Sequence, residues 1–284
     1  NGEEGKVKSI LPLAKKYGAA VLALALDKRG IPKNSKARLK VAKRIIDKAV
    51  SLGIAKEDII VDPLTLAISA KPEQAKETLC AIRELKKKGF SSSLGVSNIS
   101  FGLPNRRKIN ADFFSLALAF GLDLAIINPS DDNMFRVAKA KIKRKMTEAE
   151  IKKFLRDALS PAQEIVKKEA RTEAGKPKDI RQRLKEAVLY GDKDNIVSYV
   201  EEALSSGIAP LTINSSILIP ALEIVGEKFG KREYFLPQVI LSAEAVQRAF
   251  GRLKKEIKPE EVEDKGTIVI ATVEGDIHDI GKNI

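Results

Sequence analysis

The sequence predicts an α/β region followed by an α-helical region, with the beginning of a second α/β region at its end. Three observations predict this. Amphipathic helical stretches alternate with short apolar runs from residue 1 to residue 130, at a spacing of about 30 residues that is typical of βα units. Between residues 179 and 258 the pattern is helical throughout. The apolar run "TIVIATV", residues 267–273, then leads into a polar turn that contains glycine.

The first region is predicted to alternate between helices and strands. Each apolar run is short and suited to burial in a parallel sheet. The predicted strands are residues 19–26, 58–63, 91–98 and 122–129, and the predicted helices are residues 11–18, 35–53, 71–89 and 110–121. Four such units are typical of half an eight-unit barrel or of a doubly wound sheet, and the pattern alone leaves both open.

Polar residues follow each predicted strand. Asp27, Asp62, Asn98 and Asn128 come at or just after the carboxyl ends of the four runs. Barrel enzymes place their chemistry at this end of the strands, so these residues indicate a ligand-binding rim. Asp and Asn also end strands and begin turns, and the pattern favours neither interpretation.

The second region is predicted to be a small four-helix bundle. Its amphipathic segments are separated by Gly, Pro or Asp, as expected for short helical hairpins. The segments are residues 178–192, 193–208, 215–235 and 236–257. The lysine-rich stretch from residue 131 to residue 178 lies between the two regions, and we expect it to be a charged linker.

Composition narrows the functional classes. The 284-residue chain has a net charge of +13, which is compatible with a polyanion partner, but the excess falls in the predicted linker with few aromatic residues to stack on bases. We therefore expect no nucleic-acid partner, and a nucleic-acid-binding or scaffold protein stays the remote alternative. The sequence contains no run of about 20 apolar residues and no signal peptide at its start, so we expect a cytoplasmic protein without a membrane partner. The chain begins with Asn and stops within a motif, so we expect it to be a segment of a longer polypeptide.

The single histidine of the sequence lies in a motif near its end. Asp276, His278 and Gly281 form D-x-H-x-x-G directly after the apolar run 267–273. This stretch resembles the corrinoid-binding module of cobalamin-dependent methyltransferases. The resemblance implies that residues 265–284 begin a Rossmann-like cobalamin-binding domain. It also implies that His278 is an axial ligand of cobalt, with Asp276 accepting a hydrogen bond from its second ring nitrogen and Gly281 contributing to the cofactor site.

The stretch "VGEKFGKREYFLPQV" in the helical region is similar to the cap that covers the corrin in the same family. The resemblance implies that residues 179–258 form this cap and that Phe229, Leu236 and Val239 contact the cofactor. Ordinary packing inside the bundle is the alternative for these side chains, because core and cap residues differ only in the direction they face.

The first region resembles the pterin-binding barrel of folate-dependent methyltransferases. The matching stretches are "IIVDP" and "LGVSNISFGLPNRRKINADFF". The resemblance implies that residues 1–130 are the second half of a TIM (β/α)8 barrel, in which Asp62 and Asn98 reach the pterin ring and Arg106 lies nearby. Asn98, which can donate and accept hydrogen bonds, would assist the chemistry at the methylated nitrogen.

The order of pterin barrel, cap and corrinoid domain resembles the middle of the cobalamin-dependent methionine synthase family. The resemblance implies methyl transfer from 5-methyltetrahydrofolate through enzyme-bound methylcobalamin to homocysteine. It implies cobalamin as cofactor, small-molecule substrates, and other modules of the same polypeptide and a flavodoxin-type or other reductant as partners. Zinc would belong only to a homocysteine module that this sequence lacks, since Cys80 is its single cysteine. A corrinoid carrier with another methyl donor or acceptor stays open as an alternative.

Overall fold

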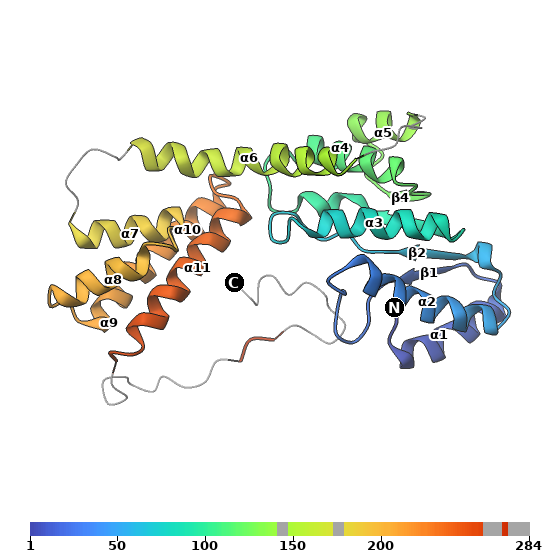
Figure 1. Ribbon diagram of the computed structural model, residues 1–284, viewed down its shortest axis with the longest axis horizontal. Coiled ribbons are helices and arrows are strands. Elements are labelled where there is room, and N and C mark those ends of the chain that lie inside the picture. The colour runs from blue at the N-terminus through green and yellow to red at the C-terminus, as the bar shows by residue number, and fades with distance from the viewer. Residues whose placement is uncertain (141–146, 173–178, 258–268, 272–284) are drawn as a thin grey trace. The chain divides into compact units, whose positions relative to one another are not determined.

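The computed structural model describes residues 1–140, 147–172, 179–257 and 269–271. The chain divides into two compact units, Asn1–Leu159 and Ser160–Ile284. The boundary lies inside one helix, next to Pro161. Each unit is described by itself below (Figure 1). Within the described ranges, no helix has the length and apolar character needed to cross a membrane.

The first unit is built on a parallel sheet. Its strands are β1 (Val21–Leu24), β2 (Ile59–Asp62), β3 (Ser91–Gly95) and β4 (Leu124–Ile126), and they lie side by side in chain order. All three pairings are parallel. The carboxyl ends of the four strands therefore meet at one edge of the sheet, as βα repeats require.

Helices precede, connect and follow these strands (Figure 1). The helices that alternate with the strands are α1 (Glu4–Tyr17), α2 (Ser35–Ser51), α3 (Gln74–Lys87) and α4 (Arg106–Ala119). Helix α2 begins where the Asn34 side chain accepts a hydrogen bond of 2.9 Å from the Ala37 backbone N–H, which satisfies a donor that the helix leaves free. Its apolar stripe, which includes Val41 and Ile45, packs in one core with Ile59 and Val61 of β2. The predicted order of elements is confirmed for this unit.

The outer strands are more exposed than the sequence predicts. Leu22 of β1 is 46% exposed, and Leu124 and Ile126 of β4 are 46% and 60% exposed. The prediction that all four strands are buried is wrong for β1 and β4. The reason is their position, because each has a neighbouring strand on one side only among the described residues, and a side chain is buried only where another element covers it.

The stretch predicted as a charged linker, residues 131–178, contains two helices. They are α5 (Asp132–Lys139) and α6 (Glu148–Thr172). In α6 the apolar residues Ile151, Phe154 and Ala158 recur at helical spacing and are buried. The Phe154 ring lies 5.9 Å from the Phe113 ring of α4, centroid to centroid. The prediction of a linker with few contacts is therefore wrong here, because charge density outweighed a helical apolar period that was present in the sequence.

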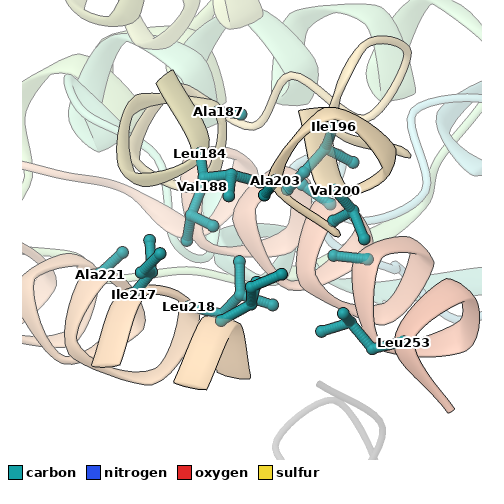
Figure 2. Packing of buried hydrophobic residues seen from close by; sticks show 13 residues of the cluster. Leu184, Ala187, Val188, Ile196, Val200, Ala203, Ile217, Leu218, Ala221 and Leu253 are labelled. Atoms are coloured by element: carbon teal, nitrogen blue, oxygen red, sulfur yellow. The ribbon is translucent and has the colours of Figure 1, made fainter. Parts of the chain in front are cut away.

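The second unit contains a helical bundle. Its elements are α7 (Ile180–Tyr190), α8 (Ile196–Ser205), α9 (Pro210–Ile213), the π-helical turn η3 (Asn214–Leu218), α10 (Ile219–Gly230) and α11 (Leu236–Leu253). Figure 2 shows side chains of α7, α8, η3, α10 and α11 meeting in one core. Helix α7 ends at Gly191, whose φ of 67° favours glycine. A Cβ there would also lie 2.5 Å from Cβ of Leu241 on α11, so Gly191 lets the two helices approach closely.

The end of the chain lies almost wholly outside the described residues. Of the strand predicted over residues 267–273, the structure describes 269–271, which have irregular backbone. Val269 and Ile270 are 85% and 69% exposed. The prediction of a buried strand is not confirmed for these three residues, because no other strand pairs with them in the described part of the chain.

The contact between α6 and α4 can be tested by truncation. We expect Phe154→Ala to lower the free energy of unfolding of the first unit by about 3 to 5 kcal/mol, since it leaves a cavity against Phe113. Lys153→Ala, at an exposed neighbouring position, is the matched control and should change it by less than about 0.5 kcal/mol. Urea unfolding followed by circular dichroism measures both. Equal stability of the two variants would restore the linker interpretation.

Candidate functional site

The first part of the site is the loop that follows β2. Asp62 is the last residue of this strand, and its backbone pairs with Leu24 of β1. The Asp62 side chain is 8% exposed and accepts a hydrogen bond of 2.8 Å at Oδ1 from the Leu64 backbone N–H. The strand end and this bond therefore fix the carboxyl group at the carboxyl edge of the sheet.

Burial changes the acid strength of Asp62. Loss of contact with water raises the pKa of its carboxyl group from 3.8 to about 6, because burial disfavours the charged form. The Leu64 N–H and the positive charge of Arg38 act in the opposite direction and favour the carboxylate. At neutral pH the group is thus an ionised but poorly solvated carboxylate, which binds strongly to a ligand that donates hydrogen bonds.

Arg38 of α2 lies beneath this loop and was not among the residues predicted from the sequence. It is fully buried, and its Nη1 donates to the backbone oxygens of Pro63 and Leu64 at 3.0 Å each. The sequence did hold a signal, because Arg38 lies on the apolar stripe of its helix, at helical spacing from Val41 and Ala42. A charged residue on that stripe requires buried acceptors.

The second part of the site is the turn that follows β3. Asn98 lies in a 3-10 turn, η2 (Val96–Ser100), in which Asn98 is exposed while Val96 and Ile99 are buried. The turn returns closely over the strand end, since a Cβ at Gly95 would lie 3.3 Å from Nδ2 of Asn98. Glycine therefore gives the amide of Asn98 room above the end of β3.

Arg106, predicted to lie near the ligand on a loop, is the first residue of α4. Its Nε donates to the Ser100 hydroxyl at 3.0 Å and its Nη2 to the backbone oxygen of Ser97 at 3.1 Å. These bonds hold the turn on both sides of Asn98. Contact with a ligand stays a prediction, whereas support of the turn is what the structure shows.

The two loops are joined to each other. The Ile68 N–H donates to the Ile99 backbone oxygen at 3.1 Å, and the Ser69 hydroxyl donates to the Phe101 backbone oxygen at 2.7 Å. Residues after β2 and residues after β3 are thus bonded across the carboxyl edge. The structure brings the Asp62 and Asn98 loops together in one supported surface.

The other two residues predicted at the rim have local partners. Asn128 follows β4, and its Oδ1 accepts a hydrogen bond of 3.0 Å from the Ser130 N–H. Asp27 follows β1 and forms ion pairs with Arg29 and Arg44 at 3.2 and 3.3 Å. For Asn128 and Asp27 the structure favours the turn-forming interpretation, because their side chains already bind neighbouring groups.

The predicted cap residues of the bundle face different environments. Phe229, near the end of α10, is 44% exposed, whereas Leu236, the first residue of α11, is 5% exposed. Val239 lies one turn further along α11 and is half-buried. Neither Phe229 nor Leu236 belongs to the core cluster in Figure 2. Phe229 therefore offers an apolar ring at the surface of its unit.

The predicted cobalt site cannot be placed on the structure. Asp276, His278 and Gly281 lie outside the described residues. Among the residues that the structure describes, no group of three His, Cys, Asp or Glu side chains could hold a metal ion. The ligand role of His278 stays a prediction.

Known proteins match both units. Residues 1–128 match the family model of the pterin binding enzymes, and residues 180–254 match that of the B12 binding domain. Along its whole length the chain is 32% identical to a methionine synthase of Mycobacterium tuberculosis (strain ATCC 25618 / H37Rv) and 31% identical to one of Mycobacterium leprae (strain TN). The resemblance to the cobalamin-dependent methionine synthase family is thereby confirmed. The matches cover 100% of this chain and 25% of each relative, so the chain spans about a quarter of the length of these curated relatives.

The buried carboxyl group predicts a pH-dependent cost in stability. Because the pKa of Asp62 is raised in the folded state, stability is present in full below pH 3.8 and is lost as the pH rises through about 6. We expect Asp62→Asn to be more stable than the unchanged chain above pH 6, by up to roughly 3 kcal/mol, and equally stable near pH 4. Asp58→Asn, at an exposed position just before β2, is the matched control. Thermal unfolding from pH 4 to 8 measures this difference, and a constant difference would contradict it.

The two aromatic and aliphatic cap candidates should differ in their effect on stability. We expect Leu236→Ala to lower the free energy of unfolding by about 2 to 5 kcal/mol, as removal of a buried leucine does. Phe229→Ala should cost less than about 1 kcal/mol, because nearly half of the side chain is already exposed. Differential scanning calorimetry of the two variants tests this, and an equal loss would place Phe229 in the packed interior.

Proposed function

We propose that this chain is part of an enzyme that transfers the methyl group of 5-methyltetrahydrofolate to homocysteine by way of bound cobalamin. The observation that carries the proposal is the occurrence of two partial sites in one chain. Asp62 and Asn98 lie on joined loops at the carboxyl edge of a parallel sheet, in a region that matches pterin binding enzymes. A region that matches the B12 binding domain follows.

The pterin would bind above the carboxyl ends of β2 and β3. The Asp62 carboxylate suits the N–H groups on the guanidine-like edge of a pterin, because both of its oxygens accept hydrogen bonds. The exposed amide of Asn98 can donate to, or accept from, the nitrogen that carries the methyl group. Arg106 supports this amide through the backbone of Ser97, so we propose that it positions Asn98.

The sheet is proposed to be half of a TIM (β/α)8 barrel, corresponding to strands five to eight. The parallel order without crossovers supports this, as does the exposure of Leu22, Leu124 and Ile126 on the outer strands. In a closed barrel such residues would be covered by the neighbouring strands. The same closure would complete the pterin site with residues from those strands.

The helical unit is proposed to cap the corrinoid. When bound, the corrinoid supplies a cobalt nucleophile that takes up and delivers the methyl group. The exposed ring of Phe229 fits an apolar ligand face, and Leu236 and Val239 would support it from α11. His278 is proposed as the cobalt ligand, with Asp276 as acceptor for its second ring nitrogen and Gly281 as part of the cofactor loop.

The remaining partners are proposals from the same family resemblance. Other modules of the polypeptide would bind homocysteine, with a thiolate zinc site, and a flavodoxin-type or other reductant would restore inactive cobalt. The pterin match favours folate as the methyl donor over the alternative of a corrinoid carrier with another donor.

The proposal predicts methyl transfer that depends on Asn98 and His278 in the polypeptide that carries this segment. We expect Asn98→Ala to slow transfer from radiolabelled 5-methyltetrahydrofolate by roughly 100-fold or more, because one well-placed hydrogen bond to a reacting centre contributes about this factor. His278→Gly should change the visible spectrum of bound cobalamin, since the lower cobalt ligand is lost.

The matched control for Asn98→Ala is Asn105→Ala, at an exposed position before α4 whose side chain does not cap that helix. Normal transfer by the Asn98 variant, together with an unchanged spectrum for the His278 variant, would contradict the proposed function.

A further inference from the structure

Arg38 is a buried cation without a buried anion bonded to it. It is 0% exposed, and within the described part of the chain no carboxylate lies within ion-pair distance of it. Burial lowers the pKa of its guanidinium to about 10, and the more distant charges of Glu77 and Asp62 act in the opposite direction. The group is therefore cationic at neutral pH. A buried charge of this kind is costly unless every donor finds an acceptor, so its contacts indicate what it is for.

The contacts of Arg38 converge on the residues that follow Asp62. Nη1 donates to the backbone oxygens of Pro63 and Leu64, and to the Thr78 hydroxyl of α3 at 2.8 Å. The Thr78 hydroxyl in turn lies 2.9 Å from the same Leu64 oxygen. One guanidinium and one hydroxyl thus bind both carbonyl groups immediately after the predicted ligand-binding carboxylate.

The other donors of Arg38 fix the guanidinium itself. Nε donates to the Pro32 backbone oxygen at 3.1 Å, and Nη2 donates to Oε1 of Gln74 at 2.5 Å. Gln74 is held in turn by a bond of 2.9 Å from its Nε2 to the Lys33 backbone oxygen. The guanidinium is therefore anchored to the loop before α2 and to α3, and its position does not depend on the Asp62 loop alone.

The backbone at Leu64 requires such support. Its φ is 69°, in the left-handed region that a leucine rarely adopts. The strained residue also donates the N–H that Asp62 accepts. Strained conformations persist where the surroundings over-determine them, and they gather at ligand sites. If the Leu64 carbonyl were released, the backbone could relax and the Asp62 carboxyl would lose its bonded partner.

We propose that Arg38 is a positioning residue of the pterin site, which holds Asp62 in its binding orientation by fixing the carbonyls of Pro63 and Leu64. This inference rests on the proposed function. Arg38 does not touch the ligand in this role.

The charge of Arg38 has a second effect that a purely mechanical support would not have. Its positive charge favours the ionised form of Asp62, and Glu77 of α3 acts on Arg38 in turn. Asp27, after the neighbouring strand β1, is already paired with Arg29 and Arg44. Removal of the Arg38 charge should therefore raise the pH at which Asp62 becomes ionised and competent to bind the pterin.

The test measures binding of 5-methyltetrahydrofolate to the full polypeptide by calorimetry from pH 5 to 8. We expect Arg38→Met to weaken binding at pH 8 by roughly 10- to 100-fold, because the carboxylate is displaced, and to raise the pH midpoint of binding by about one unit. Arg38→Lys keeps the charge but not the two carbonyl bonds, so it should weaken binding while leaving the midpoint nearly unchanged. Lys40→Met, which removes an exposed charge from the same helix, is the matched control and should change neither value.

Asp62→Asn provides the reference profile, since subtracting it cancels the titration of the ligand itself. If the unchanged protein binds no 5-methyltetrahydrofolate, the proposed function fails. If it binds, and folded Arg38→Met shows the affinity and midpoint of the unchanged protein, only the role of Arg38 is overturned.

Thr78→Val covers the case in which Arg38→Met does not fold. It removes the hydroxyl that contacts both Arg38 and the Leu64 oxygen, with little change in shape. We expect binding weaker by roughly tenfold with an unchanged midpoint, as for loss of one supporting hydrogen bond. Unchanged affinity in both Thr78→Val and Arg38→Lys would overturn the inference.

Discussion

The parallel pairing of β2 with β1 and β3 is the constraint on which the candidate pterin site depends. Because the strands run in one direction, Asp62 at the end of β2 and Asn98 just beyond β3 lie at the same edge of the sheet. The bonds from Ile68 to Ile99 and from Ser69 to Phe101 then join the two loops. Strand direction selects the edge, and the loop bonds make it a defined surface.

The chemistry at this edge has a cost in stability that the fold carries elsewhere. A poorly solvated carboxylate and a left-handed leucine are both unfavourable by themselves, and here they are adjacent along the chain. The apolar contacts of α2 with β2 lie directly behind them. A well-packed helix face thus supports a strained polar loop, which is a common division between the core and the ligand edge of βα folds.

The two units use their apolar residues in different ways. The bundle keeps small and aliphatic side chains such as Ala187, Val200 and Leu218 in a core of its own (Figure 2), so its fold does not need Phe229. That ring is free to face a ligand or a partner domain. In the first unit the corresponding exposed apolar groups lie on β1 and β4, where strand neighbours rather than a ligand would cover them.

The sequence by itself determined the local elements and the residue types of the site. The 3.6-residue period gave α2 and the bundle helices, and the strand-end motifs indicated Asp62 and Asn98, because period and motif are properties of neighbouring residues. Tertiary structure decided what depends on distant partners. It decided that Arg38 is bonded to the loop after Asp62, that Arg106 supports a turn, and that residues 148–158 pack on the first unit as a helix. It also decided that Leu236 is buried while Phe229 is exposed, since burial depends on which distant element covers a side chain.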